Sequence, residues 1–348
     1  MILSVISGAP PPSAGGAEPF DLSPYTNLAW TPVWPTAPTT TSSQAVTPAN
    51  ISSHINATKS LTLGGGSYGS LSVTGNDQAF ILQSGAVVQD FALGSGVSRI
   101  VIRGENPRDG TIRSIRGTSG TVNDILINGV TMNANATAGQ HLAGSVALVP
   151  YDGARWAIVN SFVESVDYSI YSFSGTAGGG ITNLIVANNN FQANSSGSAS
   201  GVRLGSSEHL IYVRNRLQNR ANGQHFRLHS GWSPTAGQAI TGAYIGYNQF
   251  EYLITTGFST HNITPLANGG DDGASMAGVI FEENTTYRDT GDGPIAFGSG
   301  TPPSTPNELL IRNNVVYGAS AWPSGTSYVT LTGNTRSAYT SPPSWSYA

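Results

Sequence analysis

The chain of 348 residues has no cysteine, a single lysine (Lys59), and only 10% charged residues. Without cysteine, neither a disulfide framework nor a thiolate metal site is possible. The formal net charge of −4 gives no general attraction to polyanions, so we expect no nucleic-acid partner. No apolar run approaches the roughly 18 residues of a membrane-spanning helix, so we expect no membrane partner either.

Glycine and proline are abundant, at 43 and 20 residues, and Asn, Ser and Thr are frequent. These residues favour turns and extended structure, whereas the strong helix formers Lys and Met number one and three. Hydrophobic residues still reach 39%, which is enough for a packed core. The composition therefore predicts an all-β fold with many turns.

A repeat of about 30 residues runs through the chain from about residue 124 onward. Each copy is an apolar strand followed by asparagine: DILINGV (124–130), WAIVNSF (156–162), NLIVANNNF (183–191), HLIYVRNRL (209–217), GAYIGYNQF (242–250), GVIFEENTTY (278–287) and ELLIRNNVV (308–316). The repeated asparagines are Asn128, Asn160, Asn189, Asn215, Asn248, Asn284 and Asn314. Asparagine tolerates the left-handed conformation of a tight bend, and its amide can bond the same amide in the next coil. We therefore predict an asparagine ladder at one corner of a solenoid.

A second apolar strand lies between successive ladder strands, in segments 145–152, 168–174, 201–207, 224–230, 255–261 and 294–300. On this coil pattern and its asparagines, residues 60–332 resemble the right-handed parallel β-helices of the pectate-lyase-like superfamily. The resemblance implies a solenoid of about ten coils.

Residues 1–47 form a Pro-, Ser- and Thr-rich segment that we expect to be an extended arm, with Tyr25, Trp30 and Trp34 as its aromatic contacts. The arm either straps onto its own domain or attaches the chain to another subunit or particle. Its first residues are apolar but lack a basic region, so they make a poor secretory leader.

The β-helix is expected over residues 48–332. A short helix within 48–59 would cap its first coil, with Asn50 or Ser52 as N-cap. Residues 333–348 are expected to be a C-terminal capping tail.

A cationic strip is predicted on the second strands. His225, Arg227 and His229 alternate along one strand and so share a face. Stacking the coils in register places Ile170, Val202, Phe226 and Ile295 inward. The same stacking sets Tyr171, Arg203 and Arg227 in one outward column.

Arg203 and Arg227 would then lie one strand spacing apart, about 4.8 Å, which costs Coulomb energy unless an anion or carboxylate lies between them. We interpret the strip as a site for an acidic or hydroxyl-rich extended ligand, with Tyr151, Tyr171 and Trp232 available to stack on sugar rings. Alternatively, the arginines pair with surface carboxylates such as Glu164, Glu208 or Asp152.

Residues 212–231, YVRNRLQNRANGQHFRLHSG, are similar to a stretch of alginate lyase and chondroitinase B-type β-helix enzymes. The resemblance implies β-elimination with a lysine base and an arginine acid. Only Arg203 matches the lysine position, so His225 or His229 becomes the candidate base, with Arg227 polarising the substrate carboxylate.

Two acidic loops, 268–273 and 287–293, carry Asp271, Asp272, Asp289 and Asp292. Paired carboxylates suit glycoside hydrolysis, and Asp-Gly loops offer oxygen ligands to calcium. Solvated turn aspartates are the third interpretation. No cofactor other than this calcium is expected.

The chain also resembles β-helix tailspikes. That resemblance implies a bacteriophage virion surface protein that trimerises, binds host-surface polysaccharide with or without cleaving it, and docks other virion proteins through its arm. The rival hypothesis is a secreted polysaccharide lyase or glycoside hydrolase acting on an acidic polysaccharide, with lyase chemistry favoured. A binding solenoid without catalysis is the third. The expected location is the virion or the extracellular space.

Overall fold

The computed structural model describes residues 18–25, 28, 30–118, 120–134, 146–149, 152–165, 168–172, 180–193, 202–204, 207–219, 226–228, 239–252, 275–287, 309–318 and 329–343. In these ranges the regular elements are strands, apart from one short 3-10 turn, η1 (Ile51–Ser53). None of the described elements is a helix long and apolar enough to span a membrane. The all-β prediction is confirmed.

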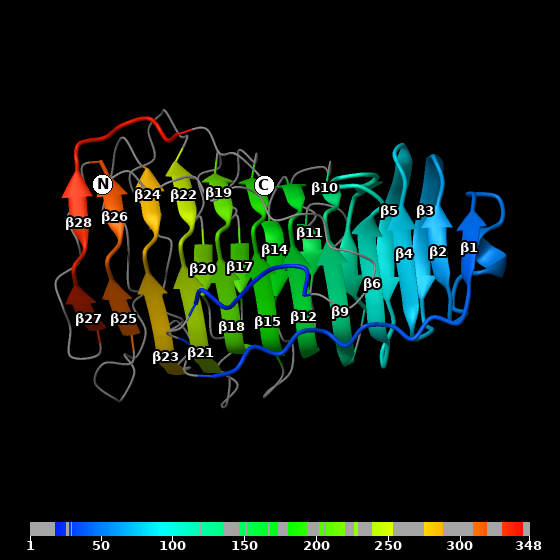
Figure 1. Ribbon diagram of the computed structural model, residues 1–348, viewed down its shortest axis with the longest axis horizontal. Helices are drawn as coiled ribbons and strands as arrows, with labels where there is room; N and C mark the ends of the chain where they lie inside the picture. Colours follow the sequence, from blue (N-terminus) through cyan, green and yellow to red (C-terminus); the bar gives the residue numbers. More distant parts are fainter. Residues whose placement is uncertain are drawn as a thin grey trace.

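Sheet A is a stack of twelve parallel strands, each from a successive coil (Figure 1). Its strands are β1 (Ser43–Val46), β2 (Ser60–Leu63), β4 (Gln78–Leu82), β6 (Ser98–Gly104), β9 (Val122–Asn128), β12 (Gly153–Val159), β15 (Ile181–Ala187), β18 (Ser207–Val213), β21 (Ala239–Gly246), β23 (Ser275–Glu282), β25 (Leu309–Arg312) and β27 (Val329–Thr332). Strands β9 to β25 coincide with the seven repeats found in the sequence. The described residues supply twelve rungs of this sheet, where about ten coils were expected.

Sheet B divides into two branches. Its long strand β5 (Ala86–Leu93), which also pairs with β3 (Gly66–Val73), meets β7 (Thr111–Ile112) along one half and β8 (Ile115–Gly117) along the other. Branch B1 continues from β7 through β10 (Thr131–Ala134), β13 (Phe162–Ser165), β16 (Asn190–Ala193), β19 (Arg216–Asn219), β22 (Gln249–Tyr252), β24 (Thr285–Tyr287), β26 (Val315–Tyr317) and β28 (Thr335–Ser337). Branch B2 continues from β8 through β11 (Val146–Val149), β14 (Tyr168–Ser172), β17 (Val202–Leu204) and β20 (Phe226–Leu228).

Coils that contain both branches therefore have three sides. Four strands of branch B2, β11, β14, β17 and β20, match predicted second strands, whereas segments 255–261 and 294–300, with Ile295, lie outside the described residues. Branch B1 was missed. Its last strand, β28, lies beyond the β-helix boundary expected at residue 332.

The core is a set of inward columns in strict register. One runs through the middle of sheet A: Ile127, Ile158, Val186, Tyr212, Ile245, Phe281 and Ile311. All seven are at most 1% exposed. Burying one such aliphatic or Phe side chain stabilises the fold by roughly 1.5–3 kcal/mol, so repetition over many rungs supplies the apolar driving force.

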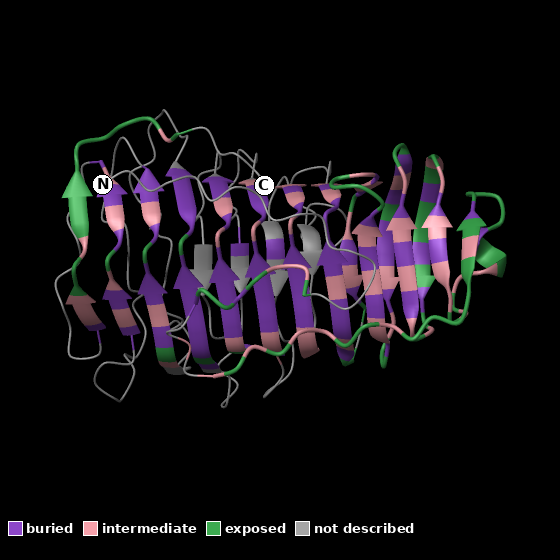
Figure 2. Ribbon diagram, in the orientation of Figure 1, coloured by how far each residue is buried: buried purple, intermediate pink, exposed green. Residues whose placement is uncertain are grey.

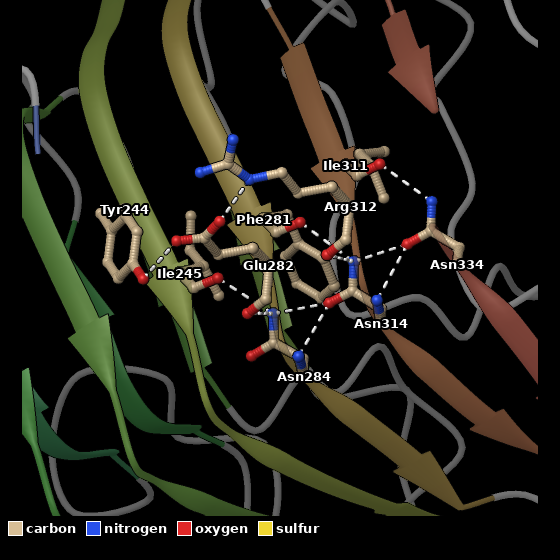
Figure 3. Close-up of polar contacts among 9 residues, drawn as sticks. All are labelled: Tyr244, Ile245, Phe281, Glu282, Asn284, Ile311, Arg312, Asn314 and Asn334. Atoms are coloured by element: carbon tan, nitrogen blue, oxygen red, sulfur yellow. Dashed lines mark hydrogen bonds and ion pairs between the residues drawn. The ribbon is translucent and has the colours of Figure 1, made fainter. Parts of the chain in front are cut away.

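The asparagine ladder lies at the corner between sheet A and branch B1. Asn189 donates from Nδ2 to Oδ1 of Asn215 at 3.0 Å, and its backbone N–H donates to the same oxygen at 3.0 Å. The same pair of bonds recurs through Asn248, Asn284, Asn314 and Asn334, with Nδ2–Oδ1 distances of 2.9 to 3.2 Å. Figure 3 shows its final rungs. The ladder is confirmed at five predicted positions and also includes Asn334, which the repeat alignment missed.

Asn128 and Asn160 were wrongly assigned to this ladder. Ser161 occupies the ladder position in its coil, where its N–H donates to Asn189 Oδ1 at 2.9 Å. Asn160 instead has φ of 55° and belongs to the neighbouring column of left-handed residues, where it donates from Nδ2 to Asn128 Oδ1 at 3.0 Å. The corner thus has two adjacent columns. The left-handed bend falls on one position, where Asn188 also donates to Asn160 Oδ1, and the longer amide ladder falls on the next.

The cap of the first coil is shorter than expected. Only η1 forms within residues 48–59, and Asn50 makes no side-chain cap to it. The Asn50 Oδ1 instead accepts the N–H of Thr47 at 2.7 Å, a local bond of the kind that competes with helix. Ile51 and Ile55 still pack against the core.

Candidate functional site

The arm straps over the outer face of sheet A of its own chain (Figure 1). Leu22 and Tyr25 are each 7% exposed and join an apolar cluster with outward residues of four A strands: Ala157, Val159, Ile185, Ala187, Ile211, Val213 and Tyr244. Trp30 and Trp34 pack against the same cluster. Figure 2 shows these strands as buried beneath the strap. Of the two interpretations of the arm, the described part matches the strap.

Polar contacts fix the register of the strap. The N–H groups of Thr36 and Thr39 donate to Oδ1 of Asp124 and Asp77 at 2.8 and 3.0 Å. Each aspartate is also held by an arginine of the next rung, and hydrogen bonds from Arg99 lower the pKa of Asp77. Closer to the N-terminus, the strap makes an aromatic contact with sheet A. The rings of Trp30 and His209 stack there with centroids 5.2 Å apart. The strap is thus bound at several successive rungs.

A buried polar contact joins β21, β23 and β25 at the edge of the sheet A face that the strap covers (Figure 3). Tyr244 donates to Oε1 of Glu282 at 2.6 Å, and Arg312 binds the other oxygen of this carboxylate, which is 2% exposed. Burial, followed by the bond to Glu282, raises the pKa of Tyr244. Tyr25 lies over this site, with its ring centroid 6.1 Å from that of Tyr244.

The structure places the predicted strip on branch B2. Tyr171 pairs with Arg203, and Arg203 pairs with Arg227, so the three positions form one column in successive rungs, as the alignment predicted. They alternate with Ile170 and Val202, which are fully buried in the core. His225, His229, Tyr151 and Trp232 lie outside the described residues, so their membership of the site stays a prediction.

Arg116 extends this column and was missed by the sequence analysis. On β8 it pairs with Val149 of β11, two rungs before Tyr171. Its Nε and Nη2 donate to Asp90 Oδ2 at 3.0 and 2.8 Å, while 41% of the side chain remains exposed. Its guanidinium is therefore held in place by a carboxylate that is only 7% exposed.

The three carboxylates offered as partners for the strip arginines have separate positions. Glu164 lies on B1 and accepts from Asn133 Nδ2 at 3.1 Å. Glu208 lies on sheet A, 4.0 Å from His209 Nε2, and half-buried Asp152 precedes β12. Two of the three thus belong to other faces than B2.

The acidic loops with Asp271, Asp272, Asp289 and Asp292 fall outside the described residues. Within the described ranges, no group of three or more His, Asp or Glu side chains is arranged to hold a metal ion. The calcium and hydrolase interpretations stay predictions.

Branch B1 presents a polar outer face that sequence reasoning did not identify. At its centre, Arg216 binds Glu251 through Nε and Nη2 at 2.6 and 2.9 Å, and Gln218 and Gln249 also donate to this carboxylate. Glu251 is fully buried although it alternates with core Phe250. A charge removed from water in this way needs such partners, because an unpaired buried charge is strongly destabilising.

The fold places the chain among known β-helix proteins. The polygalacturonase of Erwinia carotovora ssp. carotovora superposes with a TM-score of 0.51 over 88% of this chain and 100% of that one, at 12% identity. The chain has the right-handed parallel β-helix fold. The A-module of a mannuronan C-5 epimerase from Azotobacter vinelandii aligns over 85% of this chain and 93% of that module, at 10% identity and a TM-score of 0.37. No family model and no curated protein matches the sequence. The predicted resemblance is confirmed for the fold.

Proposed function

We propose that the protein binds an acidic polysaccharide along the outer face of branch B2. The observation that carries this proposal is the register of Arg203 with Arg227 in adjacent rungs. Arginines on adjacent strands, about 4.8 Å apart, place like charges in neighbouring rungs, which costs Coulomb energy unless an anion lies between them. Arg116, which is paired with Asp90, adds a guanidinium held in place at the start of the column, and Tyr171 adds an aromatic position between Arg116 and Arg203. A polyanion that follows the column would meet positive charge on several rungs.

The chemistry proposed for this site is β-elimination. His225 or His229, as neutral imidazole, would take the proton α to the substrate carboxylate while Arg227 neutralises that carboxylate. The electron pair of the broken C–H bond forms the new double bond as the glycosidic C–O bond on the β carbon breaks. The departing oxygen takes up a proton, so the products are an unsaturated sugar end and a free hydroxyl end.

Incubation with alginate, polygalacturonate, chondroitin sulfate and a neutral dextran tests this proposal. Unsaturated product is followed by ultraviolet absorbance, hydrolysis by new reducing ends, and binding by calorimetry. Each arginine makes a charge-assisted contact worth about 1.5–3 kcal/mol, so Arg203→Ala and Arg227→Ala should each weaken binding of the preferred polyanion at least about tenfold.

Exposed Arg336, on the last strand of branch B1, provides the control, since Arg336→Ala removes the same charge at a position outside the B2 column. Equal losses in all three variants would mean that net charge, not the B2 column, controls binding. Reducing ends without unsaturated product would instead indicate hydrolysis, for which the aspartates of the acidic loops are the candidates.

We retain the trimeric virion spike as the proposed setting and the secreted enzyme as its alternative. The strap weakens one argument for the spike, because Tyr25 is already buried on its own chain. Sedimentation of the full chain distinguishes the two, since a spike of this type should be trimeric and the enzyme monomeric.

A further inference from the structure

The outer face of branch B1 carries a group of polar and aromatic side chains at the rungs of β10, β13 and β16. Asn133, Glu164 and Gln192 pair in register as one column, and Phe162 pairs with Asn190 in the column beside it. We call these five residues the B1 patch. All but Asn190 are partly exposed, unlike Glu251 further along the same face.

Two amide oxygens in the B1 patch have no hydrogen-bond partner. Asn190 is 3% exposed, and its Oδ1 is buried without a donor. The Oδ1 of Asn133 is likewise buried and unpartnered, although its Nδ2 donates to Glu164 at 3.1 Å. Buried carbonyl oxygens in proteins nearly always accept a hydrogen bond. The two oxygens, on rungs about 10 Å apart, therefore indicate a ligand that brings several donors.

Phe162 supplies the apolar part of the patch. It is partly exposed, it lies between the rungs of the two asparagines, and an aromatic ring in that position offers a flat apolar surface. The Glu164 carboxylate beside it accepts hydrogen bonds and disfavours an anionic ligand. A ligand with hydroxyl donors, an apolar ring face and no negative charge satisfies all three features.

We propose that the B1 patch is a binding site for a neutral saccharide, with one sugar ring on Phe162 and hydroxyl groups donating to Asn190 Oδ1 and Asn133 Oδ1. The site lies on a different branch of the sheet from the arginine column and selects a neutral ligand in place of an acidic one. It goes beyond the proposed function, and either can fail without the other.

Calorimetry and saturation-transfer NMR with neutral gluco-, manno- and galacto-hexasaccharides test the site on the full chain. At least one should bind, and Phe162→Ala and Asn190→Leu should each weaken it at least tenfold. Asn190→Asp, which keeps an acceptor oxygen, should weaken it less than Asn190→Leu. Val315→Ala is the control, because Val315 occupies the column of Asn190 four rungs further on and should leave affinity unchanged.

The double variant Arg203→Ala/Arg227→Ala separates the two proposals. It should lose the acidic polysaccharide and keep the neutral hexasaccharide, while Phe162→Ala should do the reverse. If Phe162→Ala does not fold, Phe162→Leu fills most of the same volume without the ring and takes its place. Binding of none of the hexasaccharides, or binding that survives both Phe162 and Asn190 variants, overturns the proposal.

Discussion

In sheet A and in branch B1 every second residue points outward, but the outward residues are apolar on sheet A and mainly polar on B1. Outward positions of sheet A, such as Val159, Ile185 and Ile211, are apolar and lie under the strap. Outward positions of branch B1, such as Arg216 and Gln192, are polar. A parallel β-helix needs only its inward face to be apolar, so an apolar outward face requires a cover. The arm is best understood as the second layer that sheet A requires.

The largest expected loss of stability comes from placing a charged side chain on the apolar outer face of sheet A. Ile211→Asp puts a carboxylate under the strap without a partner, and we expect the free energy of unfolding to fall by about 4 kcal/mol or more. Gln192→Glu also adds a carboxylate, on B1 and beside Glu164 in the same column, and should cost at most about 1 kcal/mol. Urea titration measures both. Equal losses would mean that the two faces do not differ as the packing indicates.

A smaller effect is expected from the strap itself. Tyr25→Ala removes a side chain that is 7% exposed, and comparable buried aromatic truncations cost about 3–5 kcal/mol. We expect a value below that range, because the strap can detach while the coils stay folded. Limited proteolysis should then cut the arm first, and dye binding should report the uncovered face. Tyr339, which is 40% exposed, is the control, and Tyr339→Ala should change neither signal.

The smallest effect concerns alkaline pH. Burial raises the pKa of Tyr25 and Tyr244 above the usual value near 10, so above pH 10 the unfolded chain loses protons that the folded chain keeps. Stability is therefore intact below pH 10 and falls as the pH rises, by about 1 kcal/mol per pH unit for each tyrosine. Tyr25→Phe should make the decline shallower. An unchanged slope would show that this phenol is not protected by the strap.

Much of the fold was predictable because coil repetition leaves a periodic record. The seven ladder strands and branch B2 follow from apolar alternation at a spacing of about 30 residues. The prediction was one residue off at Asn160 and two residues off at Asn128, which pairs with Val159. Asparagine suits more than one position of the corner, and adjacent pairs such as Asn188 and Asn189 do not show which one carries the ladder. Branch B1 was missed because its strands begin directly after the corner, so their first residues, such as Phe162 and Phe191, were counted as the ends of the seven repeats.

The candidate sites were less predictable. The column of Tyr171, Arg203 and Arg227 follows from aligning equivalent strands, whereas Arg116 lies where one long strand divides in two and the repeat is not yet established. The face covered by the strap depends on contacts between residues far apart in sequence. Asn160 Nδ2, for example, donates to the carbonyl of Pro19 at 3.1 Å, a contact that no local pattern encodes.

The ladder corner also determines where this protein can change its length. Successive ladder asparagines are 26, 33, 36, 30 and 20 residues apart, yet the distances that join their amides stay between 2.9 and 3.2 Å. Coil length thus varies between 20 and 36 residues while the ladder corner keeps its geometry. Segments inserted or exchanged at the other corners leave this alignment intact, so new recognition loops can be acquired one coil at a time without redesign of the scaffold.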